Sequence, residues 1–287
     1  MMATATQPTD EEVEPDFPPG RYLELPGRGV TFVRDQPGPA NRLPIVLLHG
    51  WTVTADLNFF TVYGGLRGIG RIIAVDQRGH GRGIHTKERF RLEDVADDLD
   101  ATLAILDIPR ALIVGYSMGG AVAQLMAHRH PDRTAGLVLC STSCRFRRST
   151  EQSFLWDRVI PATAAALSLT PDALRSGLFE RFAMTRNTIA PRWMREQIAR
   201  NDPAAMVQAG VAIGGFDASD WIGDLAMKVA SIVTTNDVTV PAAHQRSTAK
   251  RAGATVFEIN ADHRAAVSHP NLFLPALRRA IAHVTPR

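Results

Sequence analysis

The sequence predicts an α/β fold: a mostly parallel β-sheet flanked by helices and interrupted once by a helical insertion. Two observations predict it. Short apolar, β-branched runs alternate with segments in which apolar residues recur at three- and four-residue steps, and this alternation is typical of parallel strands joined by helices. Between residues 144 and 218 the strand-like runs stop, and short helical patterns broken by proline and glycine replace them.

The chain begins with a polar, acidic and proline-rich stretch, residues 1–20. This stretch has too few large apolar residues to pack, so we expect a disordered tail. The sheet is predicted to be built from residues 21–143 and 219–287, with residues 144–218 as the insertion. A chain of 287 residues is long enough for one large α/β domain.

The predicted strands are apolar runs bounded by turn residues. In chain order they are residues 21–25, 30–35, 44–50, 71–76, 111–116, 135–141, 229–237 and 254–260. Five apolar residues between Leu92 and Leu106 share one face of a predicted helix. A second helix follows residue 117 and stops near Pro131, and a closing helix starts near Pro270.

Composition argues against several classes of protein. No apolar run reaches the roughly 18 residues of a membrane span, and no secretory signal is visible, so we expect a cytoplasmic protein. The two cysteines, Cys140 and Cys144, offer too few ligands for a zinc site and fit a reducing compartment. The net charge is only +3, with acidic and basic residues interleaved, so we expect no nucleic-acid partner.

The stretch "GYSMG" at residues 115–119 predicts a nucleophile. It fits G-x-S-x-G between a predicted strand and a predicted helix, the setting that makes this short pattern informative. The turn is tight enough to strain the backbone of Ser117 and to exclude side chains two residues before and after it. The helix N-terminus then faces the oxyanion that forms when the hydroxyl attacks a carbonyl. The alternative is a helix-capping serine in a glycine-rich turn.

A serine nucleophile needs a base, and the base needs an orienting group. With this motif the two partners are expected in the order acid, then histidine. His263 follows the predicted strand 254–260 directly and should project from the same sheet edge as Ser117. Asp237 ends the predicted strand 229–237 and is our candidate for the acid.

Other residues fit these two roles less well. The other acidic residues considered belong to turns or adjoin His263 in sequence; they are Asp220, Asp224 and Asp262. The other histidines beyond the insertion fall within or beside predicted helices; they are His244, His269 and His283. We expect turn or surface roles for Asp220 and Asp224, surface roles for His244 and His283, and a helix-starting role for His269.

Two backbone N–H groups are predicted to bind the oxyanion. One belongs to Met118, directly after the nucleophile, and the other to Trp51 in the loop after the strand 44–50. We expect His49 to shape that loop through hydrogen bonds of its side chain. The Trp51 indole can pack in the core while its N–H serves the site.

Five motifs in order resemble the α/β-hydrolase superfamily. They are "HGW" at 49–51, "DQRGHGRG" at 76–83, "GYSMGG" at 115–120, "TTNDVTVP" at 234–241 and "ADHRAAV" at 261–267. The resemblance covers residues 21–287 apart from the insertion. It implies an eight-stranded sheet, a helical cap over residues 144–218 and a site formed by Ser117, Asp237 and His263, with no metal or other cofactor. Relatives usually carry serine where Gly83 stands, and we interpret that loop as support for the site wall.

The leading hypothesis is a serine hydrolase of a carboxylic ester, thioester or lactone, whose partner is a small acyl substrate. Alternatives on the same triad are a C–C bond hydrolase and a perhydrolase, and a non-catalytic ligand-binding protein is less favoured. A serine nucleophile argues against the haloalkane dehalogenases and epoxide hydrolases, which use aspartate.

Substrate choice is expected to depend on the insertion and on aromatic residues at the site. The pocket candidates are Trp51, Tyr116, Phe154, Trp156, Phe182 and Trp193. Three arginines that open the insertion, Arg145, Arg147 and Arg148, could meet anionic lipid. A solvated charged face is the favoured interpretation of these arginines, so peripheral membrane contact is not expected.

Overall fold

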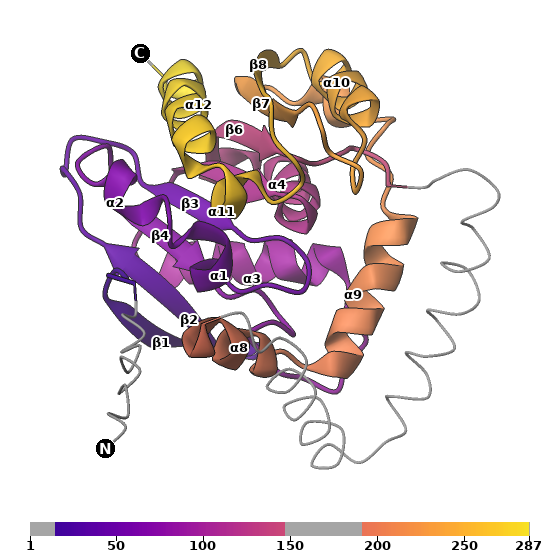
Figure 1. Ribbon diagram of the computed structural model, residues 1–287. Coiled ribbons are helices and arrows are strands. Elements are labelled where there is room, and N and C mark those ends of the chain that lie inside the picture. Colours follow the sequence, from indigo (N-terminus) through magenta and orange to yellow (C-terminus); the bar gives the residue numbers. More distant parts are fainter. Residues whose placement is uncertain (1–14, 147–190, 287) are drawn as a thin grey trace, which may run out of the picture.

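The computed structural model describes residues 15–146 and 191–286, and an eight-stranded sheet lies at the centre of this part of the chain (Figure 1). The strands follow the order β1-β2-β4-β3-β5-β6-β7-β8 across the sheet. Their bounds are β1 Gly20–Leu25, β2 Gly29–Gln36, β3 Ile45–Leu48, β4 Ile72–Val75, β5 Ala111–Tyr116, β6 Thr134–Cys140, β7 Val229–Thr234 and β8 Thr255–Ile259. Each predicted strand is present, which confirms the predicted fold class.

The sheet is mostly parallel. Strand β1 pairs antiparallel with β2, and β2 pairs antiparallel with β4. Every other neighbouring pair is parallel. The carboxyl ends of β3, β5, β7 and β8 therefore meet at one edge of the sheet, and the loops that follow them converge there.

Helices cover both faces of the sheet (Figure 1). One face is covered by α3 Leu92–Ile105 and α4 Met118–Arg129, and the other by α1 Ala55–Phe59, α2 Tyr63–Leu66, α11 Ala265–Ser268 and α12 Pro270–Val284. Successive strand residues alternate between the two cores. In β3, for example, Ile45 and Leu47 join the core that includes α12, whereas Val46 and Leu48 join the core that includes α4.

The described part of the insertion is helical, as predicted. It contains α8 Arg192–Ala199, which contacts α1, and α9 Pro203–Gly215, which contacts α3. Asp202 begins α9 by accepting hydrogen bonds from the N–H groups of Ala204 and Ala205. Residues 147–190 lie outside the described residues.

The two ends of the insertion lie side by side. Arg145 and Asp217 form an isolated antiparallel bridge, and the Ala218 N–H donates to the Cys144 carbonyl over 2.7 Å. The Arg145 guanidinium also lies 3.3 Å from the Asp217 carboxylate. The neck closes at residues 144 and 218, the bounds predicted for the insertion. It also gives one of the three arginines considered for lipid contact a carboxylate partner.

The disordered tail predicted for residues 1–20 extends too far along the chain, into residues that make specific contacts. Residues 1–14 lie outside the described residues, but the chain just before Gly20 makes specific contacts. The Phe17 ring lies under the Arg34 guanidinium, 4.7 Å away, and meets Trp193 edge-on at 5.7 Å. The Pro18 carbonyl accepts a hydrogen bond from Arg34. The Pro19 carbonyl also accepts a hydrogen bond from the Asp35 N–H. One aromatic side chain and two carbonyls thus order this segment despite its polar composition.

Candidate active site

Ser117 stands at the sharp turn between β5 and α4. Its backbone has φ 52° and ψ −114°, a left-handed conformation that is strained for a residue with a side chain. A Cβ added at Gly115 would lie 2.3 Å from the Gly119 carbonyl oxygen, and one added at Gly119 would lie 2.2 Å from the Leu48 oxygen. Both glycines are therefore required by the close passage of helix and strand, as the motif predicts.

A continuous line of hydrogen bonds joins the three predicted residues. Oγ of Ser117 lies 3.0 Å from Nε2 of His263, and Nδ1 of His263 lies 2.7 Å from Oδ2 of Asp237. The carboxylate can only accept, so Nδ1 carries the proton and Nε2 presents its lone pair to the serine hydroxyl. This is the arrangement in which the imidazole can take the hydroxyl proton.

Hydrogen-bond donors surround the Asp237 carboxylate and fix its orientation. Oδ1 accepts from the backbone N–H groups of Thr239 and Val240, each at 2.8 Å. Oδ2 accepts from the Thr234 hydroxyl at 2.9 Å and from Nε2 of Gln245 at 3.0 Å, besides His263. The side chain has no exposed surface.

The structure adds two supporting residues that sequence reasoning missed. Gln245 of α10 Ala242–Arg251 joins Asp237, the Thr234 N–H and the Val240 carbonyl through its amide. Tyr116 donates its hydroxyl proton to the His263 carbonyl over 2.7 Å. The position of Tyr116 beside the nucleophile is visible in the sequence, but no local pattern points to Gln245.

The loop after β3 passes beside the nucleophile. A Cβ on Gly50 would lie only 3.4 Å from the Cβ of Ser117, and the Gly50 N–H is held by Oδ1 of Asn58 at 2.8 Å. Met118 is the first residue of α4, where N–H groups have no partner within the helix. The N–H groups of Trp51 and Met118, predicted as oxyanion donors, therefore come from two segments that flank Ser117.

A profile of the α/β-hydrolase fold matches residues 44–270, most of the chain. The chain belongs to the α/β-hydrolase fold family. It is 31% identical over 151 residues to the non-heme chloroperoxidase of Streptomyces lividans, covering 50% of this chain and 47% of that protein. The match therefore spans less than half the length of that relative.

Two further proteins match this α/β hydrolase over most of its length. The pimeloyl-[acyl-carrier protein] methyl ester esterase of Chromobacterium violaceum is 29% identical over 242 residues, which is 81% of this chain and 92% of that protein. The solved structure of the enol-lactonase from Burkholderia xenovorans LB400 superposes with a TM-score of 0.72 at 23% identity, covering 91% of this chain and all of that one. The structural likeness shows the fold alone.

Two buried histidines stay neutral beside the candidate site. The Nδ1 proton of His49 is donated to the Gly50 carbonyl and Nε2 accepts from the Gln77 N–H, so its ring fixes the turn into the loop, as predicted. Burial lowers the pKa of His49 to about 4. Burial, reinforced by His49, lowers the pKa of His80 to about 3, and Nε2 of His80 has no hydrogen-bond partner in the described structure.

These two pKa values predict an acid-sensitive fold. The unfolded chain takes up protons on both histidines below about pH 6.5, while the folded chain does not until about pH 4. Stability is therefore full above pH 6.5 and falls as the pH is lowered toward 4. Between about pH 7.5 and about pH 5, each histidine should cost about 2 kcal/mol in the free energy of unfolding.

Urea unfolding at the two pH values measures this loss. His80→Phe keeps a ring in the slot beside Phe90 and should remove about half of the pH-dependent loss, whatever its own effect on stability. An equal free energy of unfolding at both pH values would show that the histidines are protonated in the fold.

The pocket candidates meet different outcomes. Trp51 is half-buried, donates its indole N–H to the Met206 carbonyl at 2.7 Å and packs against Gly210 of α9. Trp193 is half-buried on α8 and meets the Phe60 ring edge-on at 5.0 Å, so it helps to seat the insertion. Tyr116 is 4% exposed and packs against Phe273 in the core that includes α12, because alternation along β5 turns this residue to that face, so its pocket role stays a prediction. Phe154, Trp156 and Phe182 lie outside the described residues.

The loop over residues 76–83 explains the departure at Gly83. A Cβ there would lie 2.4 Å from the carbonyl oxygens of Asp76 and Gln77, so this turn has no room for the serine found in relatives. The loop is held by the buried Asp76 carboxylate, which accepts from Arg82 at 2.9 Å and from the Ala55 N–H. These hydrogen bonds hold the loop in one conformation, which its predicted role as support for the site wall requires.

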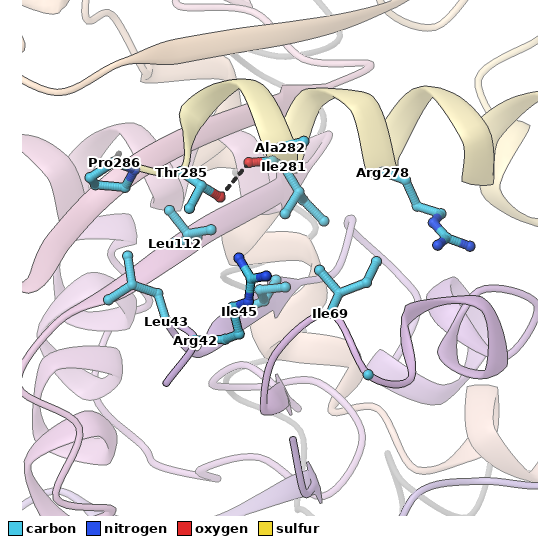
Figure 2. Close-up of a pocket in the computed structure, with 11 residues that line it drawn as sticks. Arg42, Leu43, Ile45, Ile69, Leu112, Arg278, Ile281, Ala282, Thr285 and Pro286 are labelled. Atoms are coloured by element: carbon cyan, nitrogen blue, oxygen red, sulfur yellow. Dashed lines mark hydrogen bonds between the residues drawn. The ribbon is translucent and has the colours of Figure 1, made fainter. Parts of the chain in front are cut away.

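A surface hollow of about 520 Å³ lies at the other edge of the sheet (Figure 2). Its lining includes Ile45 and Leu112, which stand at the amino ends of β3 and β5, whereas Ser117 follows the carboxyl end of β5. The five residue steps from Leu112 to Ser117 span roughly 16 Å of extended chain. The lining residues, which include Arg42 and Arg278, contain no nucleophile paired with a base. This hollow is therefore separate from the candidate active site.

Neither a metal-binding cluster nor a membrane-spanning helix is found in residues 15–146 and 191–286. No three His, Cys, Asp or Glu side chains of these ranges gather in a way that could hold a metal ion. None of the helices in these ranges is long and apolar enough to cross a membrane.

Proposed function

We propose that the chain is a serine hydrolase that cleaves a carboxylic ester, thioester or lactone through an acyl-enzyme on Ser117. The observation that carries the proposal is the unbroken hydrogen-bond line from Ser117 through His263 to Asp237, with the serine in a strained turn at a helix N-terminus. The methyl ester esterase that matches 81% of this chain supports ester chemistry. The relatives named chloroperoxidase and enol-lactonase make related reactions on the same triad worth testing.

The proposed reaction has two halves. Oγ of Ser117 attacks the acyl carbon while Nε2 of His263 takes the hydroxyl proton, and the N–H groups of Trp51 and Met118 stabilise the oxyanion. The bond to the alcohol oxygen then breaks as His263 returns the proton to it. Water, deprotonated by His263, attacks the acyl-enzyme and releases the carboxylic acid and free Ser117.

Transfer of the acyl group to hydrogen peroxide is a second candidate. The 31% identity to a protein named non-heme chloroperoxidase favours it. Peroxide would replace water in the second half, so that the acyl-enzyme yields a peracid and free Ser117. Measuring peracid formation with an activated acetate ester and hydrogen peroxide tests this candidate without changing the role of any residue.

A fluorophosphonate should label Ser117 and abolish ester hydrolysis. Such a reagent reacts with a serine hydroxyl that a base activates, and Ser117 is the hydroxyl that contacts Nε2 of His263. Intact mass spectrometry should show the mass of one label, and peptide mapping should place it on residue 117. Ser141 and Ser143 are buried serines near the turn and serve as internal controls. A label on another residue, with Ser117 unmodified, would contradict the proposal.

A further inference from the structure

Asn201, between α8 and α9 of the insertion, joins two loops of the candidate site. Its side chain is buried, with 4% of the residue exposed. Oδ1 accepts from the Gly81 N–H at 2.8 Å, and Nδ2 donates to the Thr52 carbonyl at 3.2 Å. Because an N–H can only donate and a carbonyl can only accept, these two partners fix which way the amide faces.

The Thr52 end of this bridge lies next to a proposed oxyanion donor. Thr52 has φ 67°, a left-handed conformation that is unfavourable for a β-branched residue and needs outside support. The contacted carbonyl lies in the Thr52–Val53 peptide and the Trp51 N–H in the Gly50–Trp51 peptide, so only one peptide unit separates the two groups. A loss of the Asn201 contact would release a strained backbone one residue from the Trp51 N–H.

Two more contacts tie the 50–54 loop to the insertion. The Trp51 indole donates to the Met206 carbonyl of α9 at 2.7 Å, and the Thr54 hydroxyl lies 3.1 Å from Oε1 of Gln197 on α8. Gln197 is 4% exposed. The loop is thus held on one side by the sheet, through β3, and on the other by residues of the insertion.

The bridge is not needed merely to attach the insertion to the sheet domain. The Asp202 N–H donates to the Gly79 carbonyl at 3.1 Å, and Oε1 of Gln208 accepts from the Phe90 N–H at 2.7 Å. Ala205 also packs closely on Gly79: a Cβ added at Gly79 would lie 2.4 Å from the Cβ of Ala205. The insertion is therefore attached to the sheet domain without the Asn201–Thr52 contact, which instead holds the 50–54 loop.

We infer that Asn201 is a positioning residue that holds the 50–54 loop so that the Trp51 N–H faces the oxyanion formed at Ser117. This inference rests on the proposed function. It gives the insertion a part in the chemical step, because residues of the insertion support the oxyanion site. An oxyanion donor stabilises the transition state only when it is held in place before the reaction begins.

Asn201→Asp is the sharpest test, because the new side chain has the same shape. Its carboxylate still accepts from Gly81 but presents an oxygen to the Thr52 carbonyl, which repels it. With p-nitrophenyl acetate, kcat should fall roughly 10- to 100-fold and KM should stay within about twofold, less than the 10²–10³-fold cost of deleting an oxyanion donor. Affinity for a trifluoromethyl ketone that forms an oxyanion on Ser117 should fall in parallel.

Three readouts separate positioning from general damage. The low-field proton signal of Nδ1 in His263 should be unchanged in Asn201→Asp, because its bond to Asp237 does not involve the loop. The ratio of variant to wild-type kcat should rise as the pH is lowered, since the introduced carboxyl group, once protonated, can again donate to Thr52. Gln208→Ala, which breaks a matched contact between α9 and the sheet domain, should keep kcat within about twofold of wild type.

Two results would overturn the inference. One is an Asn201→Asp enzyme with wild-type kcat and wild-type affinity for the ketone. The other is a loss of kcat in Gln208→Ala as large as in Asn201→Asp, which would mean that any loosening of α9 has the same effect. Failure of the proposed function is distinguishable, because Ser117→Ala would then retain ester hydrolysis.

Discussion

Ser117→Ala should lower kcat on an activated ester by about 10⁴- to 10⁶-fold, the range seen when a triad nucleophile is removed. The variant loses the atom that forms the acyl-enzyme, while His263 and the N–H groups of the turn remain. Residual hydrolysis would come from oxyanion stabilisation and binding alone. Steady-state kinetics on purified protein, with the fold checked by circular dichroism, measures the loss.

The same position offers a stability control. Ser117 has a positive φ that alanine also finds unfavourable, whereas glycine adopts it freely. Ser117→Gly should therefore be as inactive as Ser117→Ala yet more stable to unfolding by about 1 kcal/mol. Equal activity of wild type and Ser117→Ala would end the nucleophile proposal, and equal stability of the two variants would show that the turn is not strained.

Asp237→Asn should lower kcat by about 10³- to 10⁴-fold, by analogy with the same change in serine proteases. Within the described part of the chain, the hydrogen-bond partners of this carboxylate are all donors. The two backbone N–H groups at Oδ1 cannot turn away, so the asparagine oxygen should stay there and its NH₂ group should face Nδ1 of His263. That contact forces the proton onto Nε2, where it blocks transfer from the Ser117 hydroxyl.

Matched variants decide whether Asp237 is the acid. Asp224→Asn removes an exposed carboxylate that precedes β7 and should leave kcat near wild type. His263→Ala should cost at least as much as Asp237→Asn, and the double variant little more than either, because triad members act as a unit. An active Asp237→Asn beside an inactive Asp224→Asn would mean that the acid is misassigned. An active His263→Ala would contradict the whole triad.

Much of this fold is determined by patterns that act over a few residues. Apolar runs such as residues 111–116 bury both faces of a strand, so their position in the sequence marks the sheet. The glycines at 115 and 119 are equally local, because each one sits where a Cβ would strike the adjoining helix or strand. Ser117, Asp237 and His263 can be chosen from the sequence since each directly follows or ends a predicted strand, and parallel strands finish at one edge.

Local composition is misleading where distant residues supply the partners. It predicts disorder for the segment before Gly20, yet Phe17 and two carbonyls find Arg34, Trp193 and Asp35. The place of Tyr116 beside the nucleophile predicts contact with substrate, but the twist and alternation of β5 turn it into the opposite core. Neither outcome has a signal within a few residues of the position concerned.

Only the tertiary structure decided which side chains hold the candidate site in place. Gln245 reaches Asp237 from α10, and Asn201 reaches Thr52 from a segment 149 residues away. Such bonds depend on where a packed helix places one amide, to within a few tenths of an ångström, and many buried positions could have supplied it. Strand order and the strained turn follow from local sterics and hydrophobicity, whereas this supporting layer exists only once the sheet, α10 and the insertion have packed together.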